Sequence, residues 1–393
     1  MSTAVLAGRT VVVANWRDLD HSLAGGAERY AWELARALVD AGARVEYLTA
    51  REPGQARRLV RDGIRVRRGG GRLSFYAYAA AYLLRHRRRI DAVVDAEAGI
   101  PVFSPWWVGR RTAVTLLMHH VHQRQFDTYF PGPVAAFGRF VERRVMPRVY
   151  RRARAIAVSD STRLEMARQL GWAGPVEVVV NGSAAPLPIA VHPADTVDRI
   201  AAVGRLSPHK RVDLVVRAVA ALIAVRPTLH LDIVGDGPDA AALRRLVDDL
   251  GVEKHVMLHG FVDEATKAQL LAHARLHVCA SDVEGWGQVV VEAASYGVPT
   301  LARDVPGLRG SVRHERTGWL IEETGADLGA VQSRLTVGIE RALDELDDEE
   351  RRAEIAVECR DWAGRFSWGR MHAEAVALVA ASINENRSRN DER

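Results

Sequence analysis

The sequence has little cysteine and no long uncharged apolar segment. Of its 393 residues only Cys279 and Cys359 are cysteines, too few for a disulfide framework or a cysteine metal site. A reducing cytoplasm is therefore the expected compartment. No run of about eighteen apolar residues without charge occurs, so a membrane-spanning helix is not expected. Residues 1–8 also lack the basic start and apolar core that a signal peptide needs.

Lysine is scarce, and the charge that remains is distributed unevenly. Residues 1–190 hold 29 Arg and no Lys against 16 Asp and Glu, a net charge of +13. The remaining residues hold 25 Lys and Arg against 33 Asp and Glu, a net charge of −8. A coding preference for arginine explains the missing lysines but does not explain this asymmetry. A basic half beside an acidic half indicates that the first half meets an anionic surface or substrate.

Length and apolar patterning predict two α/β domains. Short apolar runs such as Thr10–Asn15 and Ile200–Gly204 alternate with helical patterns, which favours buried parallel strands. The segment 184–198 contains three prolines and has no apolar period, so we interpret it as a linker. We expect one domain at residues 1–185 and a second at 198–365, with a last helix at about 366–383.

The segment Ser281–Pro299 carries the most specific chemical pattern. An apolar strand precedes it, a glycine-containing turn holds Glu284, and Gln288–Tyr296 shows helical spacing. A strand, a glycine turn and a helix together present free backbone N–H groups to an anion. Glu284 and Glu292 lie eight residues apart, and an ionised carboxylate accepts hydrogen bonds from sugar hydroxyls. The alternative is a solvated loop acid and an ordinary ion-paired glutamate.

Arg205 and Lys210 lie in a second loop between a strand and a helix. An arginine fork and a lysine point charge five residues apart suit a diphosphate. Only three lysines occur in the chain, so a lysine at this position is informative. Ordinary solvated charges are the alternative interpretation.

Two glycines in the first domain, Gly25 and Gly26, precede a predicted helix. The loop before them has about nine residues, whereas a dinucleotide fingerprint needs three glycines in a tight turn. A simple Rossmann dehydrogenase site is therefore not expected. Taken alone, the glycine pair is equally compatible with a flexible start of a helix.

Three histidines, His119, His120 and His122, follow the predicted strand Thr112–Met118. The carboxyl end of such a strand is where open α/β sheets bind ligands. Zinc sites usually combine helical or strand-partner spacing with a distant further ligand, which this run does not show. We therefore expect no metal here. Each histidine alone is also compatible with a loop side chain bonded to backbone.

These segments together resemble the retaining GT-B glycosyltransferases of family 4, which use sugar nucleotides. The Glu-x7-Glu signature matches Glu284 and Glu292. The pattern Gly-Arg-Leu-x-x-x-Lys-x-x-Asp matches Gly204–Asp213, and Gly-Gly-x-Glu matches Gly25–Glu28. The motifs occur in the family's order over nearly the whole chain.

The resemblance implies two Rossmann-like domains facing across a cleft, with the last helix crossing back to the first domain. It also implies that Glu284 contacts the donor sugar, that Glu292 contacts the ribose, and that a histidine lies near the reacting centre. The catalytic candidates are therefore His119, His120 and Glu284. The expected donor and phosphate contacts are Gly25, Gly26, Arg205, Lys210, Gly285, Trp286, Gly287, Gln288 and Val289.

The implied activity is that of a hexosyl- or other glycosyltransferase in carbohydrate biosynthesis. It moves a sugar from a nucleotide-diphosphate sugar to a hydroxyl of a glycan, a lipid-linked acceptor or a natural product, with retention through an ion-pair-like front-side route. Asp18-Leu19-Asp20 has the form of a metal-binding Asp-x-Asp but precedes the glycine loop. No metal or other cofactor is therefore expected. A sugar-nucleotide epimerase of similar fold, or a basic membrane or nucleic-acid binder with a vestigial cleft, are the alternatives.

Residues 133–152 form a predicted long basic helix with an apolar face that includes Val134, Phe137 and Val141. One interpretation is a surface helix packed on its domain. The other is an interfacial helix for anionic lipid at the inner membrane face. No nucleic-acid partner is expected.

Overall fold

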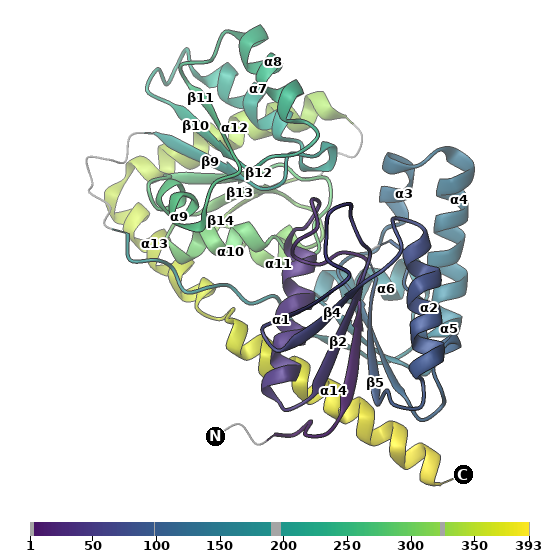
Figure 1. The fold of residues 1–393 in the computed structure, drawn as a ribbon. Helices are drawn as coiled ribbons and strands as arrows, with labels where there is room; N and C mark the ends of the chain where they lie inside the picture. Colours follow the sequence, from purple (N-terminus) through teal and green to yellow (C-terminus); the bar gives the residue numbers. More distant parts are fainter. Residues whose placement is uncertain (1–3, 98, 190–197, 323–326, 393) are drawn as a thin grey trace. The chain divides into compact units, whose positions relative to one another are not determined.

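The computed structural model describes residues 4–97, 99–189, 198–322 and 327–392, and the chain divides into two compact units. Unit 1 comprises Met1–Gly182 and Trp368–Arg393, and unit 2 comprises Ser183–Ser367. Each unit is an α/β structure built on a mainly parallel sheet (Figure 1). The predicted α/β class with two parallel-sheet domains is confirmed.

The sheet of unit 1 has the strand order β3-β4-β2-β1-β5-β6-β7-β8 among the described residues. Neighbouring strands are parallel except for the β3–β4 hairpin. Val11, Val12 and Val13 of β1 have no exposed surface, as the continuous apolar run predicts for a central parallel strand. The strands are β1 (Thr10–Ala14), β2 (Arg44–Thr49), β3 (Arg58–Arg61), β4 (Ile64–Arg68), β5 (Ala92–Glu97), β6 (Ala113–Met118), β7 (Arg154–Ala157) and β8 (Val176–Val178).

Helices of unit 1 bury one apolar stripe each against this sheet. In α1 the residues Tyr30, Leu34 and Leu38, spaced by four, are fully buried. Helix α6 begins where Ser159 Oγ accepts a 3.0 Å hydrogen bond from Thr162 N, an N-cap interaction. The helical segments are α1 (Gly26–Asp40), α2 (Ser74–His86), η1 (Ser104–Trp106), α3 (Gln123–Tyr129), α4 (Gly132–Phe140), η2 (Val141–Val145), α5 (Met146–Val149), α6 (Asp160–Leu170) and α14 (Trp368–Asp391).

The long helix predicted at residues 133–152 is present as an unbroken helical run over residues 132–149, but a π-helical turn lies within it. This turn, η2, separates α4 from α5. Each π turn adds a residue to the helical repeat, so the apolar stripe changes face at this point. Val141 and Tyr150 are buried, whereas Val134 is 51% exposed and Phe137 is 64% exposed. The expected continuous apolar face was therefore wrong.

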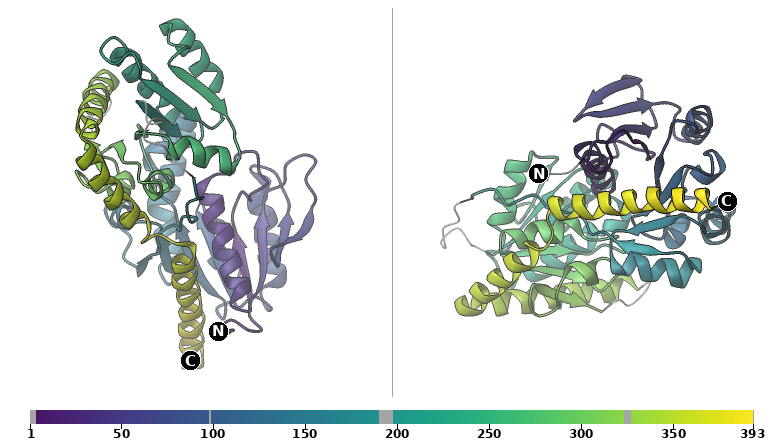
Figure 2. Two further views of the ribbon diagram at one scale, coloured as in Figure 1. Left: turned by 90° about the vertical axis from the view of Figure 1, so that its left-hand side faces the viewer. Right: turned by 90° about the horizontal axis from the view of Figure 1, so that it is seen from below.

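Helix α14 belongs to unit 1 although it ends the chain, and it lies alongside α1 (Figures 1 and 2). His372 Nε2 lies 3.1 Å from Glu33 Oε2 of α1, and Arg154 of β7 is paired with Glu385. Asn386 Nδ2 also donates to the carbonyl of Arg110. These contacts continue along the helix, which therefore runs past the predicted end at residue 383 to Asp391.

The sheet of unit 2 is parallel throughout, with the strand order β11-β10-β9-β12-β13-β14. This is the 3-2-1-4-5-6 order of a doubly wound Rossmann fold, in which the direction of winding reverses between β9 and β12. Ligands of such sheets bind at the carboxyl ends of the strands beside that reversal. The strands are β9 (Arg199–Val203), β10 (His230–Val234), β11 (Val256–Gly260), β12 (Leu276–Cys279), β13 (Thr300–Arg303) and β14 (Gly318–Ile321).

Helices flank both faces of the unit 2 sheet. Helix α7 buries Val215, Val216 and Val219 against β10 and β12 and packs on α12. No helix in the described part of the chain is both long and apolar enough to cross a membrane. The helical segments are η4 (Pro208–Lys210), α7 (Val212–Leu222), α8 (Ala240–Leu250), α9 (Glu264–Ala272), α10 (Gln288–Ser295), α11 (Leu308–Ser311), α12 (Leu328–Asp347) and α13 (Glu349–Ala363).

Candidate functional site

The loops after β9 and β12 in unit 2 meet at the point where the strand order reverses. The β9 loop carries Arg205 and leads into η4, and the β12 loop carries Glu284 and leads into α10. Asp282 N donates a 2.8 Å hydrogen bond to the carbonyl of His209, which fastens one loop to the other. The two motifs that lie some 80 residues apart in the sequence are thus adjacent, as open α/β sheets require of a binding site.

An ion pair between Lys210 and Glu284 forms the centre of this site. Ser281 Oγ donates a 2.8 Å hydrogen bond to the same carboxylate oxygen, Glu284 Oε1. Burial favours the neutral acid, but the charge of Lys210 and these hydrogen bonds outweigh it, so the pKa of Glu284 is lowered. The carboxylate stays ionised and only 16% exposed, which suits it to accept hydrogen bonds from hydroxyl groups.

Two glycines allow the backbone to close tightly around this pair. Gly287 precedes α10 with φ of +69°, and a Cβ there would lie 2.7 Å from Ser311 Oγ. A Cβ on Gly307 would lie 2.2 Å from the carbonyl oxygen of Glu284. Only glycine fits both positions. The N-terminal end of α10, which carries the positive end of the helix dipole, therefore lies beside Lys210 and Glu284.

Glu292 of α10 is held by a residue that sequence reasoning missed, Lys267 of α9. Lys267 Nζ lies 3.1 Å from Glu292 Oε2 and 2.8 Å from Glu264 Oε2. Burial raises the pKa of Glu292, and Lys267 and a hydrogen bond from Gln288 only partly offset it. The scarcity of lysine was a usable signal, because two of the three lysines in the chain lie here.

The remaining predicted donor residues of unit 2 differ from one another in burial. Arg205 is half-buried and close enough to His209 to lower its pKa, after the larger effects of burial and Lys210. The indole of Trp286 is buried, with its ring centroid 5.0 Å from that of Phe366. Its side chain is therefore part of the core, and a ligand contact would use its backbone. Gly285 and Val289 lie in the turn and the first helical turn, both half-buried.

In unit 1 the glycine pair begins α1 as predicted. Gly25 and Gly26 are exposed, and Gly25 N donates a 2.7 Å hydrogen bond to Glu28 Oε2. Arg17 Nε donates to the other oxygen of Glu28 at 2.8 Å. This acid of the Gly-Gly-x-Glu motif is buried and holds the start of the helix, so its role here is to shape the loop.

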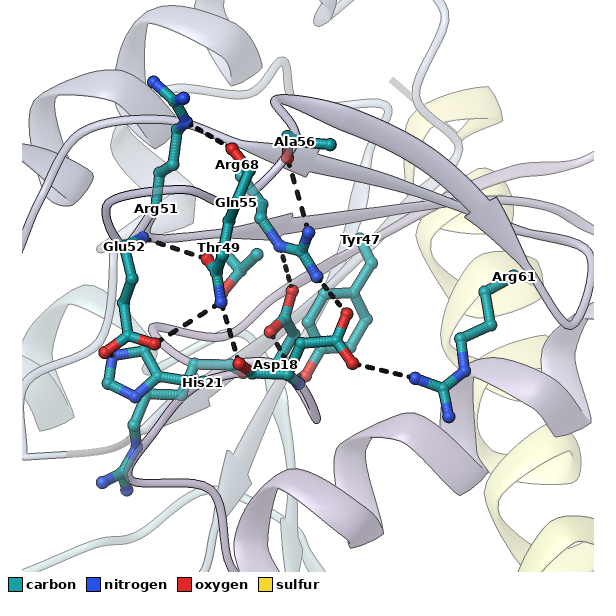
Figure 3. Close-up of polar contacts among 12 residues, drawn as sticks. Asp18, His21, Tyr47, Thr49, Arg51, Glu52, Gln55, Ala56, Arg61 and Arg68 are labelled. Atoms are coloured by element: carbon teal, nitrogen blue, oxygen red, sulfur yellow. Dashed lines mark hydrogen bonds and ion pairs between the residues drawn. The ribbon is translucent and has the colours of Figure 1, made fainter.

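Both acids of the Asp-x-Asp sequence before the glycine loop form ion pairs with arginines (Figure 3). Arg68 Nε donates to Asp18 Oδ2, and Arg68 Nη2 donates to Asp20 Oδ2, both at 2.6 Å. Arg61 Nη1 lies 3.0 Å from Asp20 Oδ1. Gln55 Nε2 also donates to the backbone of Asp20. The pair of aspartates therefore fastens the β1–α1 loop to strands β3 and β4.

The two candidate histidines at the end of β6 are not equivalent. His119 is 7% exposed, and its ring meets that of Tyr30 edge-on at a centroid distance of 5.4 Å. Burial lowers the pKa of His119 to about 3, so the imidazole is neutral. His119 Nε2 is buried without a hydrogen bond from the described residues. His120 is half-buried, and its Nε2 lies 2.7 Å from Gln125 Oε1.

His122 contacts two acids that sequence reasoning also missed. His122 Nδ1 lies 2.9 Å from Glu97 Oε2 and 3.7 Å from Glu142 Oε1. Burial disfavours the imidazolium, but the charge of Glu97 and the bonds to both acids outweigh it and raise the pKa of His122 to about 10. The three residues come from distant parts of the chain, so no local spacing indicates them.

Comparisons with known proteins match both units. Residues 24–183 match the family model Glycosyltransferase Family 4, and residues 190–345 match Glycosyl transferases group 1. A GDP-mannose-dependent alpha-(1-6)-phosphatidylinositol monomannoside mannosyltransferase of Mycolicibacterium smegmatis is 32% identical over 192 residues, covering 46% of this chain and 47% of that protein. A D-inositol 3-phosphate glycosyltransferase of Corynebacterium glutamicum is 31% identical over 201 residues, covering 48% and 44%. The matched part of the chain thus spans less than half the length of these curated relatives.

The fold has a close counterpart among solved structures. Sucrose-phosphate synthase from Thermosynechococcus elongatus matches with a TM-score of 0.77 over 94% of this chain and 98% of that one. At 20% identity this likeness concerns the fold alone. Together, the two successive family models, the curated relatives and this fold show that the chain belongs to the GT-B glycosyltransferases of the family 4 type.

Proposed function

We propose that the protein transfers a sugar from a nucleotide-diphosphate sugar to a hydroxyl acceptor. The observation that carries this proposal is the Lys210–Glu284 ion pair beside the first turn of α10, at the strand reversal of unit 2. It combines a cation and the N-terminal end of a helix for phosphate oxygens with an ionised carboxylate for sugar hydroxyls. The family matches are to transferases, so an epimerase is not favoured.

In the proposed complex the diphosphate lies between the basic loop and α10. Lys210 has three N–H donors, so it can keep Glu284 ionised while it also contacts a phosphate oxygen. Arg205 adds a fork of donors from the same loop. Glu284 accepts hydrogen bonds from the sugar, and Glu292 accepts them from the ribose. Because the pKa of Glu292 is raised by burial, two ribose hydroxyl donors would favour its ionised form.

We further propose that transfer proceeds with retention and needs no metal at the diphosphate. The bond between the anomeric carbon and the phosphate oxygen breaks, and a bond to the acceptor oxygen forms on the same face. The acceptor proton passes to the leaving phosphate. Lys210, Arg205 and the α10 N–H groups would stabilise the developing charge. The engagement of Asp18 and Asp20 by Arg68 supports this, since those carboxylates are already occupied.

For the substrates we propose a hexose donor and a sugar-containing or lipid-linked acceptor. The names of the relatives specify GDP-mannose with a phosphatidylinositol mannoside in one case and an inositol phosphate acceptor in the other. Residues 1–182 and 368–393, which make up unit 1, hold 33 Arg against 20 Asp and Glu, a net charge of +13. A phosphate-bearing acceptor on unit 1 would match this charge.

Thermal shift with a panel of UDP-, GDP-, ADP- and CDP-sugars tests the proposal. A bound donor raises the melting temperature by mass action. We expect one nucleotide class to stabilise the wild-type protein, and Lys210→Met or Glu292→Ala to abolish that shift. Lys254→Met changes an exposed lysine outside the site and should leave the shift intact. A wild-type protein that no sugar nucleotide stabilises would contradict the proposal.

We also propose peripheral contact of unit 1 with an anionic membrane at the cytoplasmic face. The supporting observation is the exposed apolar stripe of α4, formed by Val134, Phe137 and Phe140, which continues into exposed Arg143 and Arg144. Apolar side chains beside arginines suit the boundary between lipid chains and anionic head groups.

Co-sedimentation with anionic and neutral phospholipid vesicles tests this contact. The wild-type protein should bind anionic vesicles, and the double variant Phe137→Ser with Phe140→Ser should lose that binding. Phe261→Ser removes an exposed phenylalanine of unit 2, 89% accessible, and serves as the matched control. Equal sedimentation of all three proteins would exclude a role for α4.

A further inference from the structure

Glu97, His122 and Glu142 form a compact buried group in unit 1 that the proposed transfer reaction does not use. Glu97 ends β5, His122 lies in the loop between β6 and α3, and Glu142 lies in the π-helical turn η2. One ligand atom from each residue lies within 4.8 Å of the other two. The shortest separation is 2.9 Å, between His122 Nδ1 and Glu97 Oε2.

The burial of this group is unusual for its charge. The side chains of Glu97 and Glu142 have no exposed surface, and that of His122 is 12% exposed. Neither oxygen of Glu97 has a well-aligned hydrogen bond from the described residues. Buried carboxylates are generally paired with cations or bound to metal ions. Two carboxylates sharing one imidazole leave the group negative even when the imidazole is protonated, so the group lacks a full counter-charge of its own.

The surroundings hold Glu142 and His122 in fixed orientations. His122 N donates a 2.6 Å hydrogen bond to Glu142 Oε1, and Gln123 Nε2 donates a 2.5 Å hydrogen bond to Glu142 Oε2. Metal-binding carboxylates are commonly oriented by hydrogen bonds of this kind. The π turn presents Glu142 to the loop, and such turns often occur at functional positions.

We propose that Glu97, His122 and Glu142 bind one divalent transition-metal ion, with zinc as the best match. Zinc accepts imidazole nitrogen and carboxylate oxygen at about 2.0–2.2 Å, and ligand atoms around it are then roughly 3–3.5 Å apart. The ion supplies the two positive charges that the buried carboxylates lack. This inference is independent of the proposed transfer reaction, because all three ligands lie in unit 1 and none is a donor-site residue.

The ion would have a structural role in this position. It joins the end of β5, the β6–α3 loop and the π turn, and that loop also carries His119 and His120. For the loop after β6, the expectation of no metal was based on the spacing of its three histidines. In the structure only His122 of these histidines belongs to the group, and the other two ligands are the acids Glu97 and Glu142 from distant segments. The usual requirement for a distant further ligand is therefore met.

Metal analysis of the purified full-length protein is the direct test. After incubation with zinc and dialysis, the wild-type protein should retain about one equivalent of zinc. Cobalt-loaded protein should show the visible absorption of a low-coordinate site containing imidazole. His122→Gln and Glu97→Gln should lose both signals, whereas His120→Gln, a histidine of the same loop outside the group, should keep them. If His122→Gln does not fold, the zinc stoichiometry of the wild-type protein and the zinc content of Glu97→Gln still test the proposal.

Thermal stability gives a second measurement. Zinc should raise the melting temperature of metal-free wild-type protein and of His120→Gln, but not that of Glu97→Gln. Wild-type protein that retains no zinc, manganese or cobalt, and is not stabilised by any of them, would show that a metal-free arrangement of imidazole and carboxylates is the native one. Retention that His122→Gln and Glu97→Gln leave unchanged would mean that surface groups bind the metal, which overturns the proposal equally.

Discussion

Lys210 is the residue on which the proposed donor site depends most. Its ammonium group is paired with Glu284, lies on the loop that carries Arg205, and helps to lower the pKa of both Glu284 and His209. Removing it therefore changes two things at once: a phosphate ligand is lost, and a buried carboxylate is left without its partner.

Lys210→Met should reduce kcat/KM for the sugar nucleotide by about 10²–10³, the usual cost of removing one group that stabilises transition-state charge. The side chains have similar length, so packing changes little. Steady-state kinetics with Lys254→Met as control measures the effect. A variant with wild-type kcat/KM would show that the diphosphate binds elsewhere.

The two glutamates of the site should affect stability in opposite directions. Glu284 has a lowered pKa, so its ionised form adds stability above the ordinary pKa of 4.5, and this is lost as pH falls through the lowered value. Glu292 has a raised pKa, so its contribution falls as pH rises from 4.5 through the raised value. At neutral pH the first carboxylate stabilises the fold and the second opposes it.

Glu284→Gln should therefore destabilise the protein at pH 7 by about 1 kcal/mol, or roughly 2–4 °C in Tm. Glu292→Gln should not lower Tm at this pH, yet both variants should bind the sugar nucleotide more weakly. Melting curves between pH 4 and 8, with donor titrations on the same samples, separate the two effects. Parallel losses of stability in both variants would contradict the assigned pKa directions.

At the scale of single elements, the start of α10 controls the geometry of the proposed anion site. Its first turn keeps its orientation only if Gly287 retains its left-handed backbone conformation. Gly287 must also lack a Cβ, because α11 packs directly against it. The neighbouring strands β9 and β12 position the two loops that carry Lys210 and Glu284. The site is thus built from helix and strand ends, which limits how far its groups can shift.

Gly287→Ala should lower the free energy of unfolding by about 1–3 kcal/mol, because its φ is positive and its Cβ would contact Ser311 and Leu308. Donor affinity should fall as well, since the first turn of α10 must move. Gly369→Ala in α14 meets no atom within 4 Å and is the matched control. Urea unfolding and donor titration measure both effects; a neutral Gly287→Ala would show that the turn is not tightly packed.

The sequence predicted those elements whose pattern is local. The strands around Val11–Val13 and Ile200 and the helix after Gly287 followed from apolar runs, period and turn glycines. The π turn at Val141–Val145 was not predictable, because an added residue in a helical turn has no signature in apolar spacing. For the site, the family resemblance implied that Lys210 and Glu284 serve the same donor, but their ion pair was not predicted. The partnership of Lys267 with Glu292 is created by folding and was missed.

At the scale of the whole molecule, the two units differ in charge as well as in position along the chain. Unit 1 carries the net +13, while residues 183–367 hold 21 Lys and Arg against 29 Asp and Glu, a net charge of −8. The acidic unit nevertheless contains the basic loop with Lys210. In the proposed function, the local placement of a few cations therefore matters more for the donor than net charge does, whereas net charge would favour an anionic acceptor on unit 1.

Donor binding should not depend on added divalent ions. With the protein first loaded at its proposed structural site, millimolar Mg²⁺ or Mn²⁺ should change the donor Kd by less than about twofold, because cationic groups and helix N–H groups replace a metal at the diphosphate. Calorimetric titrations with and without the ions give the comparison. A donor Kd that improves tenfold or more with Mg²⁺ would contradict metal-independent binding.

The central claim is that Lys210, Glu284 and the start of α10 hold the diphosphate and the sugar of an activated donor. The most direct measurement is NMR observation of sugar-nucleotide consumption by the wild-type protein and by Lys210→Met, with the anomeric signal of the product recorded. The account predicts turnover or slow hydrolysis by the wild-type protein, a product with the donor's anomeric configuration, and loss of turnover in the variant. Equal consumption by both proteins, or a product of inverted configuration, would contradict it.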